Sequence, residues 1–101
     1  MSTESTFEKQ FLSEVKKLPN TFVPDKVDSA SIRGIPDRVL CVNGRYVALE
    51  FKRCAQEMQK SRARLQEYTL NEVGSAGGLA RFVYPDNADV VLRLLKELSR
   101  V

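Results

Sequence analysis

The chain has 101 residues, 43% of them hydrophobic, with 16 Lys and Arg against 13 Asp and Glu and a net charge of +3. This length and apolar content predict one domain, residues 1–101, with a single hydrophobic core. No apolar run is long enough for a membrane span, and the polar amino terminus lacks the layout of a secretory signal. We therefore expect a soluble, intracellular (cytoplasmic) protein.

Histidine is absent from the sequence. Its absence excludes Ser-His-Asp triads, His-paired cysteine nucleophiles, HNH-type nucleases and HExxH zinc enzymes. Catalysis must then rest on carboxylates, lysines, arginines, hydroxyls and a bound metal. Cys41 and Cys54 have no CxxC spacing, so a core or free thiol is expected rather than a disulfide or zinc site.

The first half of the chain predicts a helix, an edge strand and a hairpin. Apolar residues at helical spacing predict a helix over residues 5–18, and a short strand interrupted by Pro24 is expected over 21–28. Residues 39–49 contain two β-rich runs joined by Asn43-Gly44, the favoured two-residue type I′ turn. Both faces of these strands are largely apolar, so we expect the sheet to be covered on both sides.

The second half predicts a helix, a strand and a helix. A charged helix over residues 60–75 ends at Gly77-Gly78, and a strand over 79–84 ends at Pro85. Asp86 or Asn87 is expected to cap a last helix. The order αβββαβα predicts an α/β fold with a mixed central sheet flanked by helices.

The hairpin turn predicts which residues face one another. With Asn43 and Gly44 as the loop, Asp37 falls opposite Glu50, with Cβ atoms roughly 4.5 to 5.5 Å apart. Lys52 projects from the same face as Glu50, because strand side chains alternate. The hairpin therefore predicts three ionisable groups on one face of an otherwise apolar sheet.

Opposed carboxylates in a partly buried sheet call for a positive counter-charge. Oxygen ligands without histidine or thiolate favour Mg²⁺ or Mn²⁺ over zinc. An ExK spacing alone is common by chance, and a Pro-Asp at a strand start is usually turn chemistry. The joint pattern of Asp37, Glu50 and Lys52 is much less common, and it predicts a metal-dependent catalytic site.

These residues carry a resemblance to a known family. The segments Gly34-Ile35-Pro36-Asp37, Val47-Ala48-Leu49-Glu50-Phe51-Lys52, Gln66 and Gly77-Gly78-Leu79-Ala80 resemble the VRR-NUC branch of the PD-(D/E)XK nuclease superfamily. The resemblance spans nearly the whole chain. It is to stand-alone members typical of phage-like genomes and related to Holliday junction resolvases, and it implies a restriction-endonuclease-like αβββαβ core.

The resemblance implies a role for each site residue. Asp37 and Glu50 match the catalytic acid pair, Lys52 the catalytic lysine and Gln66 the downstream glutamine. Gln66 is also expected to face inward from its spacing with Leu70 and Val73, although a surface glutamine is an open alternative.

The family also carries an acid on its first helix, for which this chain offers two candidates. Glu4 keeps the family-like run Glu-Ser-Thr-Phe and is favoured, although a frayed terminal acid is an open alternative. Glu8 completes Ser5-x-x-Glu8, a capping box that explains it without catalysis.

The implied activity is hydrolysis of a DNA phosphodiester without a covalent intermediate. Asp37, Glu50 and the Phe51 carbonyl would hold Mg²⁺, which lowers the pKa of a water, and Lys52 would orient that nucleophile. Candidate phosphate contacts are basic residues, each of which singly is more often a solvated surface charge: Arg33, Arg38, Arg45, Lys60, Arg62 and Arg64.

The expected partner is DNA, as nothing indicates base-specific readout. We expect a structure-selective endonuclease acting on branched DNA, in particular a four-way (Holliday) junction. Because a resolvase makes two symmetric cuts, a homodimer is expected, although the wide apolar arc of the last helix is explained equally well by burial. A nuclease that cuts flaps, nicks or duplex sites, and a non-catalytic basic module that binds nucleic acid, stay open as alternatives.

Overall fold

In the computed structural model, the described residues are 3–25, 36–54, 56 and 61–100, of which 3–5 and 61–65 are described by their backbone alone. The chain begins with helix α1, Thr3–Val15. Its apolar residues Phe7, Phe11 and Val15 recur at intervals of four and share one face of the helix, which packs on the sheet. The helix predicted over residues 5–18 is confirmed, with both ends shifted toward the amino terminus by two or three residues.

Four strands form one mixed sheet in the order β1-β2-β3-β4. They are β1 (Thr21–Phe22), β2 (Arg38–Val42), β3 (Arg45–Phe51) and β4 (Leu79–Val83). The first three strands form an antiparallel meander, and β4 joins β3 in parallel. A parallel neighbour needs a crossover connection, which helix α2 (Ser61–Ser75) supplies.

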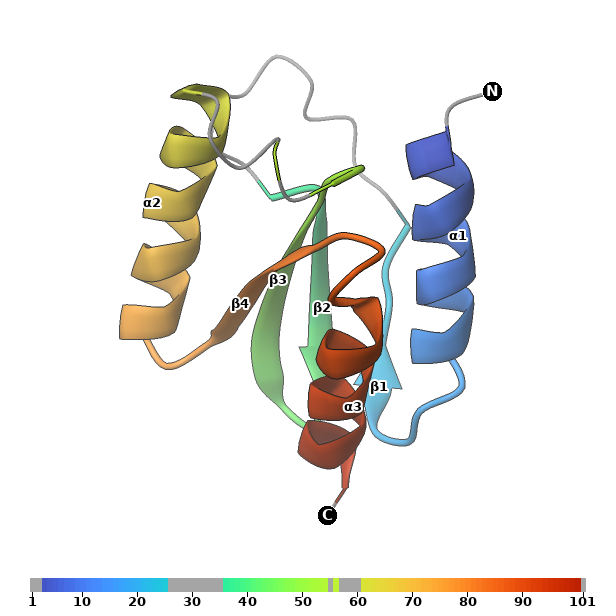
Figure 1. Ribbon diagram of the computed structural model, residues 1–101. Coiled ribbons are helices and arrows are strands. Elements are labelled where there is room, and N and C mark those ends of the chain that lie inside the picture. Colours follow the sequence, from blue (N-terminus) through green and yellow to red (C-terminus); the bar gives the residue numbers. More distant parts are fainter. Residues whose placement is uncertain (1–2, 26–35, 55, 57–60, 101) are drawn as a thin grey trace.

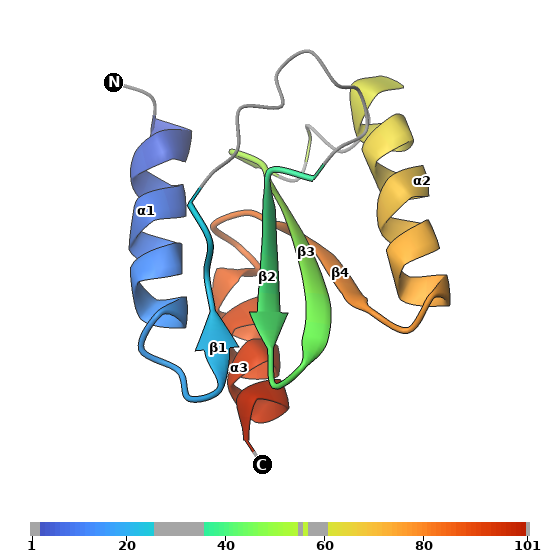
Figure 2. The same ribbon diagram turned by 180° about the vertical axis from the view of Figure 1, so that it is seen from behind.

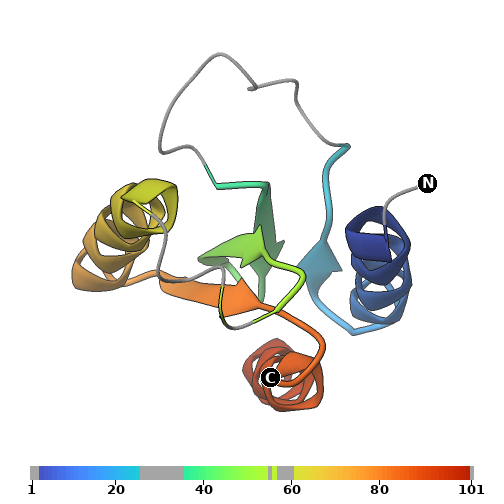
Figure 3. The ribbon, with the colours of Figure 1, turned by 45° about the horizontal axis from the view of Figure 1, so that its top comes forward.

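The helices cover the two faces of the sheet unequally. Helix α1 and the last helix, α3 (Ala88–Ser99), lie on one face, whereas α2 lies on the other, against β4 and β3 (Figures 1, 2 and 3). The predicted α/β class with a mixed sheet flanked by helices is therefore confirmed. None of the helices in the described part of the chain is long and apolar enough to cross a membrane.

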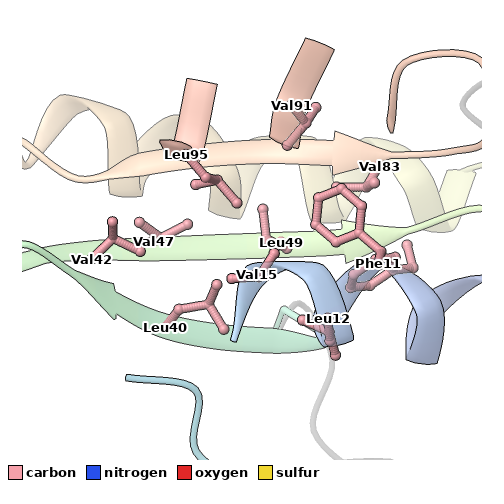
Figure 4. Close-up of a cluster of buried hydrophobic side chains, with 11 residues drawn as sticks. Phe11, Leu12, Val15, Leu40, Val42, Val47, Leu49, Val83, Val91 and Leu95 are labelled. Atoms are coloured by element: carbon pink, nitrogen blue, oxygen red, sulfur yellow. The ribbon is translucent and has the colours of Figure 1, made fainter. Parts of the chain in front are cut away.

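The hydrophobic core fills the space between the sheet and the α1–α3 layer. Figure 4 shows side chains of α1, β2, β3, β4 and α3 converging there. Its buried members are Phe11, Leu12, Val15, Leu40, Val42, Val47, Leu49, Phe51, Val83, Val91 and Leu95. Because Val91 and Leu95 are buried in this core, much of the apolar arc of α3 is accounted for within the single chain.

The β2–β3 turn is the predicted two-residue hairpin. Asn43 and Gly44 have φ values of 51° and 80°, as a type I′ turn requires. The Asn43 side-chain amide donates to the carbonyls of Leu98 and Arg100, at 3.3 and 3.0 Å. The turn therefore also satisfies carbonyl groups at the end of α3, which have no partner within the helix.

Two sequence expectations differ from the structure, and the expectation of a core or free thiol is met by its second alternative. The sheet is not fully covered on its second face, where Cys41 is exposed and Tyr46 is 49% exposed. Both cysteines are free thiols, as one alternative held, but neither lies in the core. The Asn87 side chain does not cap α3, because it accepts the Tyr84 N–H and donates to the Phe82 carbonyl.

Candidate active site

The acid pair lies where the β2–β3 ladder ends. The register pairs Val42 with Arg45 and continues to Arg38 with Leu49. One further step places Asp37 opposite Glu50, as the turn predicts. The chain bends at Asp37, so this residue stands just before β2 and outside the regular ladder.

Asp37 and Glu50 are joined by hydrogen bonds between side chains and backbone. The Asp37 N–H donates to Glu50 Oε1 at 3.1 Å. In the opposite direction, the N–H of Phe51 donates to Asp37 Oδ2 at 3.0 Å. These two bonds hold the two carboxyl groups at the same end of the hairpin.

Pro36 leaves the backbone carbonyl of Phe51 without a hydrogen-bond donor from the neighbouring strand. Continuing the register by two residues places Pro36 opposite Phe51. Proline has no N–H, so it cannot donate a ladder bond to the Phe51 carbonyl. That oxygen can therefore serve as the third ligand that the resemblance implies.

The environment of Glu50 opposes its ionisation. The residue is 3% exposed. Burial, then the charge of Asp37 and a side-chain hydrogen bond with it, raises the pKa of Glu50 from 4.5 to about 8, against a smaller lowering by Lys52. Two acids that cannot easily be ionised together form a site that a divalent cation would stabilise.

Gln66 connects the acid pair to the lysine. It is 5% exposed on α2, and its Nε2 donates to Glu50 Oε2 at 2.8 Å. Its Oε1 accepts a hydrogen bond of 2.6 Å from Lys52 Nζ. The expectation that Gln66 faces inward is confirmed, and the structure brings together Asp37, Glu50, Lys52 and Gln66.

The donor set fits a hard divalent cation. Among the residues that the structure describes, no group of three or more His, Cys, Asp or Glu side chains could hold a metal ion. Mg²⁺ commonly takes only one or two carboxylates and keeps several waters, so two acids and a carbonyl are sufficient. The residues that could hold the ion are Asp37, Glu50 and Phe51.

Two of the predicted phosphate contacts are not placed at the site. Arg38 lies on the core face, because residues two apart in a strand share a face and Leu40 and Val42 point into the core. Its Nε pairs with Glu8 Oε2 at 3.1 Å. Arg45 stands beside the hairpin turn, five residues along β3 from Glu50, or roughly 16 Å at the usual rise of a strand. Neither residue is therefore positioned to contact a phosphate held by the acids.

The other basic candidates and the first-helix acid fall outside what the structure describes in full. Arg33 and Lys60 lie outside the described residues, and Arg62, Arg64 and Glu4 belong to segments described by their backbone alone. Arg62 and Arg64 begin the helix that carries Gln66, and Glu4 lies one turn before Glu8 on α1. The roles of these residues remain predictions.

The sequence did not predict the Glu8–Arg38 ion pair. It predicted that Glu8 caps the first helix and that Arg38 contacts a DNA phosphate. One signal in the sequence could have placed Arg38, although not its partner. The alternation that puts Asp37 and Val39 on one face puts Arg38 on the other, beneath α1. The sequence offers no comparable signal for which acid of α1 meets Arg38.

No family model, curated protein or solved structure matches this chain.

Proposed function

We propose that the protein is a metal-dependent DNA endonuclease that hydrolyses phosphodiester bonds. One observation carries the proposal: the carboxyl groups of Asp37 and Glu50 are held together at the end of the hairpin, with Lys52 linked to them through Gln66. A buried acid beside a second acid destabilises a fold, whereas a bound divalent cation would offset the charge of both.

The architecture supports the finer assignment. We assign the fold as restriction-endonuclease-like, within the VRR-NUC branch of the PD-(D/E)XK superfamily. The described elements follow the αβββαβ order that the resemblance implies, with α3 added at the end. The matched residues of that resemblance, Asp37, Glu50, Lys52 and Gln66, meet at one end of the sheet.

Each side chain has a defined task in the proposed reaction. Asp37, Glu50 and the Phe51 carbonyl would hold Mg²⁺, or Mn²⁺ in its place, which would supply Lewis acidity toward the phosphate. Lys52 orients the attacking water and offsets charge that develops on the phosphate oxygens. Gln66 fixes the Lys52 ammonium through Oε1 and Glu50 through Nε2, so both groups are positioned before substrate arrives.

The proposed substrate is branched DNA, and the proposed assembly is a homodimer. A net charge of +3 favours a polyanion, and phosphate contacts position a nucleic acid without reading its sequence. Because a four-way junction is resolved by two symmetric cuts, two copies of this single-site chain are needed. Sedimentation of the protein with and without junction DNA tests the assembly.

Cleavage of a labelled four-way junction, with and without Mg²⁺ or Mn²⁺, tests the activity. Asp37→Asn and Lys52→Ala are compared with matched changes at exposed positions, Asp86→Asn and Lys9→Ala. We expect cleavage only with metal, a loss of at least about 100-fold in each site variant and no loss in either control.

Other outcomes separate the competing functions. Metal-dependent cleavage of flaps, nicks or plain duplex in preference to the junction would keep the site and change the substrate. Binding of junction DNA without cleavage under any metal would replace the nuclease with a nucleic-acid-binding module. Cleavage that survives both Asp37→Asn and Lys52→Ala would overturn the site.

A further inference from the structure

A partly buried ion pair joins α1 to β2 directly behind the acid pair. Arg38 Nε lies 3.1 Å from Glu8 Oε2, and the two side chains are 17% and 12% exposed. The guanidinium of Arg38 also donates from Nη1 to the Pro24 carbonyl at 3.4 Å. Arg38 is thus held on two sides by segments outside its own hairpin.

The same part of α1 also contacts the other strand of the site. Phe7 precedes Glu8, and its ring meets that of Phe51 edge to face, with centroids 6.0 Å apart. Phe51 lies between Glu50 and Lys52 on β3, while Arg38 follows Asp37 at the start of β2. Neighbouring residues of one helix turn therefore hold both strands at the point where the acids stand.

The ladder itself does not fix Asp37. Its last pair is Arg38 with Leu49, so Asp37 lies one residue past the final register position. Beyond the ladder, the position of Asp37 relative to Glu50 depends on the two hydrogen bonds at this end of the hairpin and on the contacts that hold the neighbouring Arg38. An anchor on Arg38 therefore opposes separation of the two strand ends.

We infer that Glu8 and Arg38 are positioning residues that hold Asp37 within reach of Glu50. Both act from the opposite face of the sheet, so neither touches the metal or the phosphate. A buried ion pair is by itself weak evidence for a gain in stability, so its location beside the site indicates a geometric role. The inference rests on the proposed function, because it concerns the same acid pair.

The affinity for Mn²⁺, measured by calorimetry, depends on the position of Asp37 relative to Glu50 and can be determined without cleavage. The variants are Glu8→Gln, Arg38→Lys and the exchange Glu8→Arg with Arg38→Glu. Two controls accompany them: Glu14→Gln removes an exposed acid of the same helix, and Val91→Ala destabilises the core away from the site. Thermal unfolding is recorded for every protein.

We expect Glu8→Gln and Arg38→Lys to bind Mn²⁺ at least about fivefold more weakly than wild type. The exchange is expected to bind more tightly than Glu8→Arg or Arg38→Glu alone. Val91→Ala lowers the unfolding temperature without weakening Mn²⁺ binding, and Glu14→Gln changes neither. Should the charge-reversed single variants not fold, Glu8→Gln and Arg38→Lys decide the matter.

Two failures are distinguishable. A wild-type protein that binds no divalent cation overturns the proposed function and this inference together. Wild-type binding that Glu8→Gln and Arg38→Lys leave unchanged, or that Val91→Ala weakens to the same degree, overturns the positioning role alone.

Discussion

The backbone N–H of Phe51 donates to the side chain of Asp37 over 3.0 Å, at the point where the β2–β3 ladder has ended. A side-chain carboxylate thus takes the place of a neighbouring strand's carbonyl as the acceptor. Asp37 is a metal ligand in the proposed function and also completes the hydrogen bonding of the strand that carries Glu50. Substitutions at this end of the hairpin should therefore change both the metal affinity and the free energy of unfolding, and the two effects can be measured separately.

Stability without metal should fall as the pH rises from about 4.5 to about 8. The folded protein holds a proton on Glu50 over this interval because burial raises its pKa to about 8, whereas the unfolded chain releases it near 4.5. The contribution of protonated Glu50 to stability is complete below pH 4.5 and is lost as the pH rises through about 8. Urea unfolding at several pH values, in chelator, measures it.

The variant Glu50→Gln isolates this effect. Without an ionisable group at this position, the pH dependence between 4.5 and 8 should flatten, and the variant should be more stable than wild type at pH 8. Metal-dependent cleavage should be lost. Equal slopes for wild type and Glu50→Gln would show that Glu50 is not the group responsible.

Replacement of Gln66 by leucine should harm both stability and turnover. It removes the amide that joins Lys52 Nζ to Glu50 Oε2 and leaves two partly or fully buried polar groups without that partner. The expected cost is about 1–3 kcal/mol of unfolding free energy, with a drop in the single-turnover cleavage rate of at least about tenfold. Chemical denaturation and single-turnover cleavage measure the two quantities.

Gln10→Leu on α1 provides the matched control, because Gln10 is exposed. It should change neither the unfolding free energy by more than about 0.5 kcal/mol nor the cleavage rate. If Gln66→Leu behaves like Gln10→Leu, the bridging role of Gln66 is wrong.

Two glycines allow backbone conformation to be tested apart from packing. A Cβ added at Gly44 or at Gly74 would meet nothing within 4 Å, but Gly44 has a φ of 80° in the hairpin turn, whereas Gly74 lies within α2. Gly44→Ala should destabilise the protein by about 1–2 kcal/mol, and Gly74→Ala should stabilise it by about 0.5–1 kcal/mol. Thermal unfolding of both variants checks the opposite signs, and two shifts of the same sign would contradict the turn assignment.

The sequence by itself determined the hairpin, its register and the residues that share a face. These features depend on local chemistry, since an Asn-Gly pair adopts positive φ readily and side chains alternate strictly along a strand. From them followed the opposition of Asp37 to Glu50 and the position of Leu40, Val42, Val47 and Leu49 on one shared face, although not which face is the core. The helical spacing of Gln66 with Leu70 and Val73 favoured an inward position, with a surface position as the alternative.

Only the tertiary structure decided which distant groups meet. An arginine such as Arg38 is usually found at the surface, and its partner Glu8 lies 30 residues away in the sequence. The ion pair therefore depends on where α1 crosses the sheet. The exposure of Tyr46 and Cys41 likewise depends on how far α2 covers the second face. Burial of Glu50, and with it the raised pKa, is set by packing that brings α2 against β3 and β4, which no local pattern specifies.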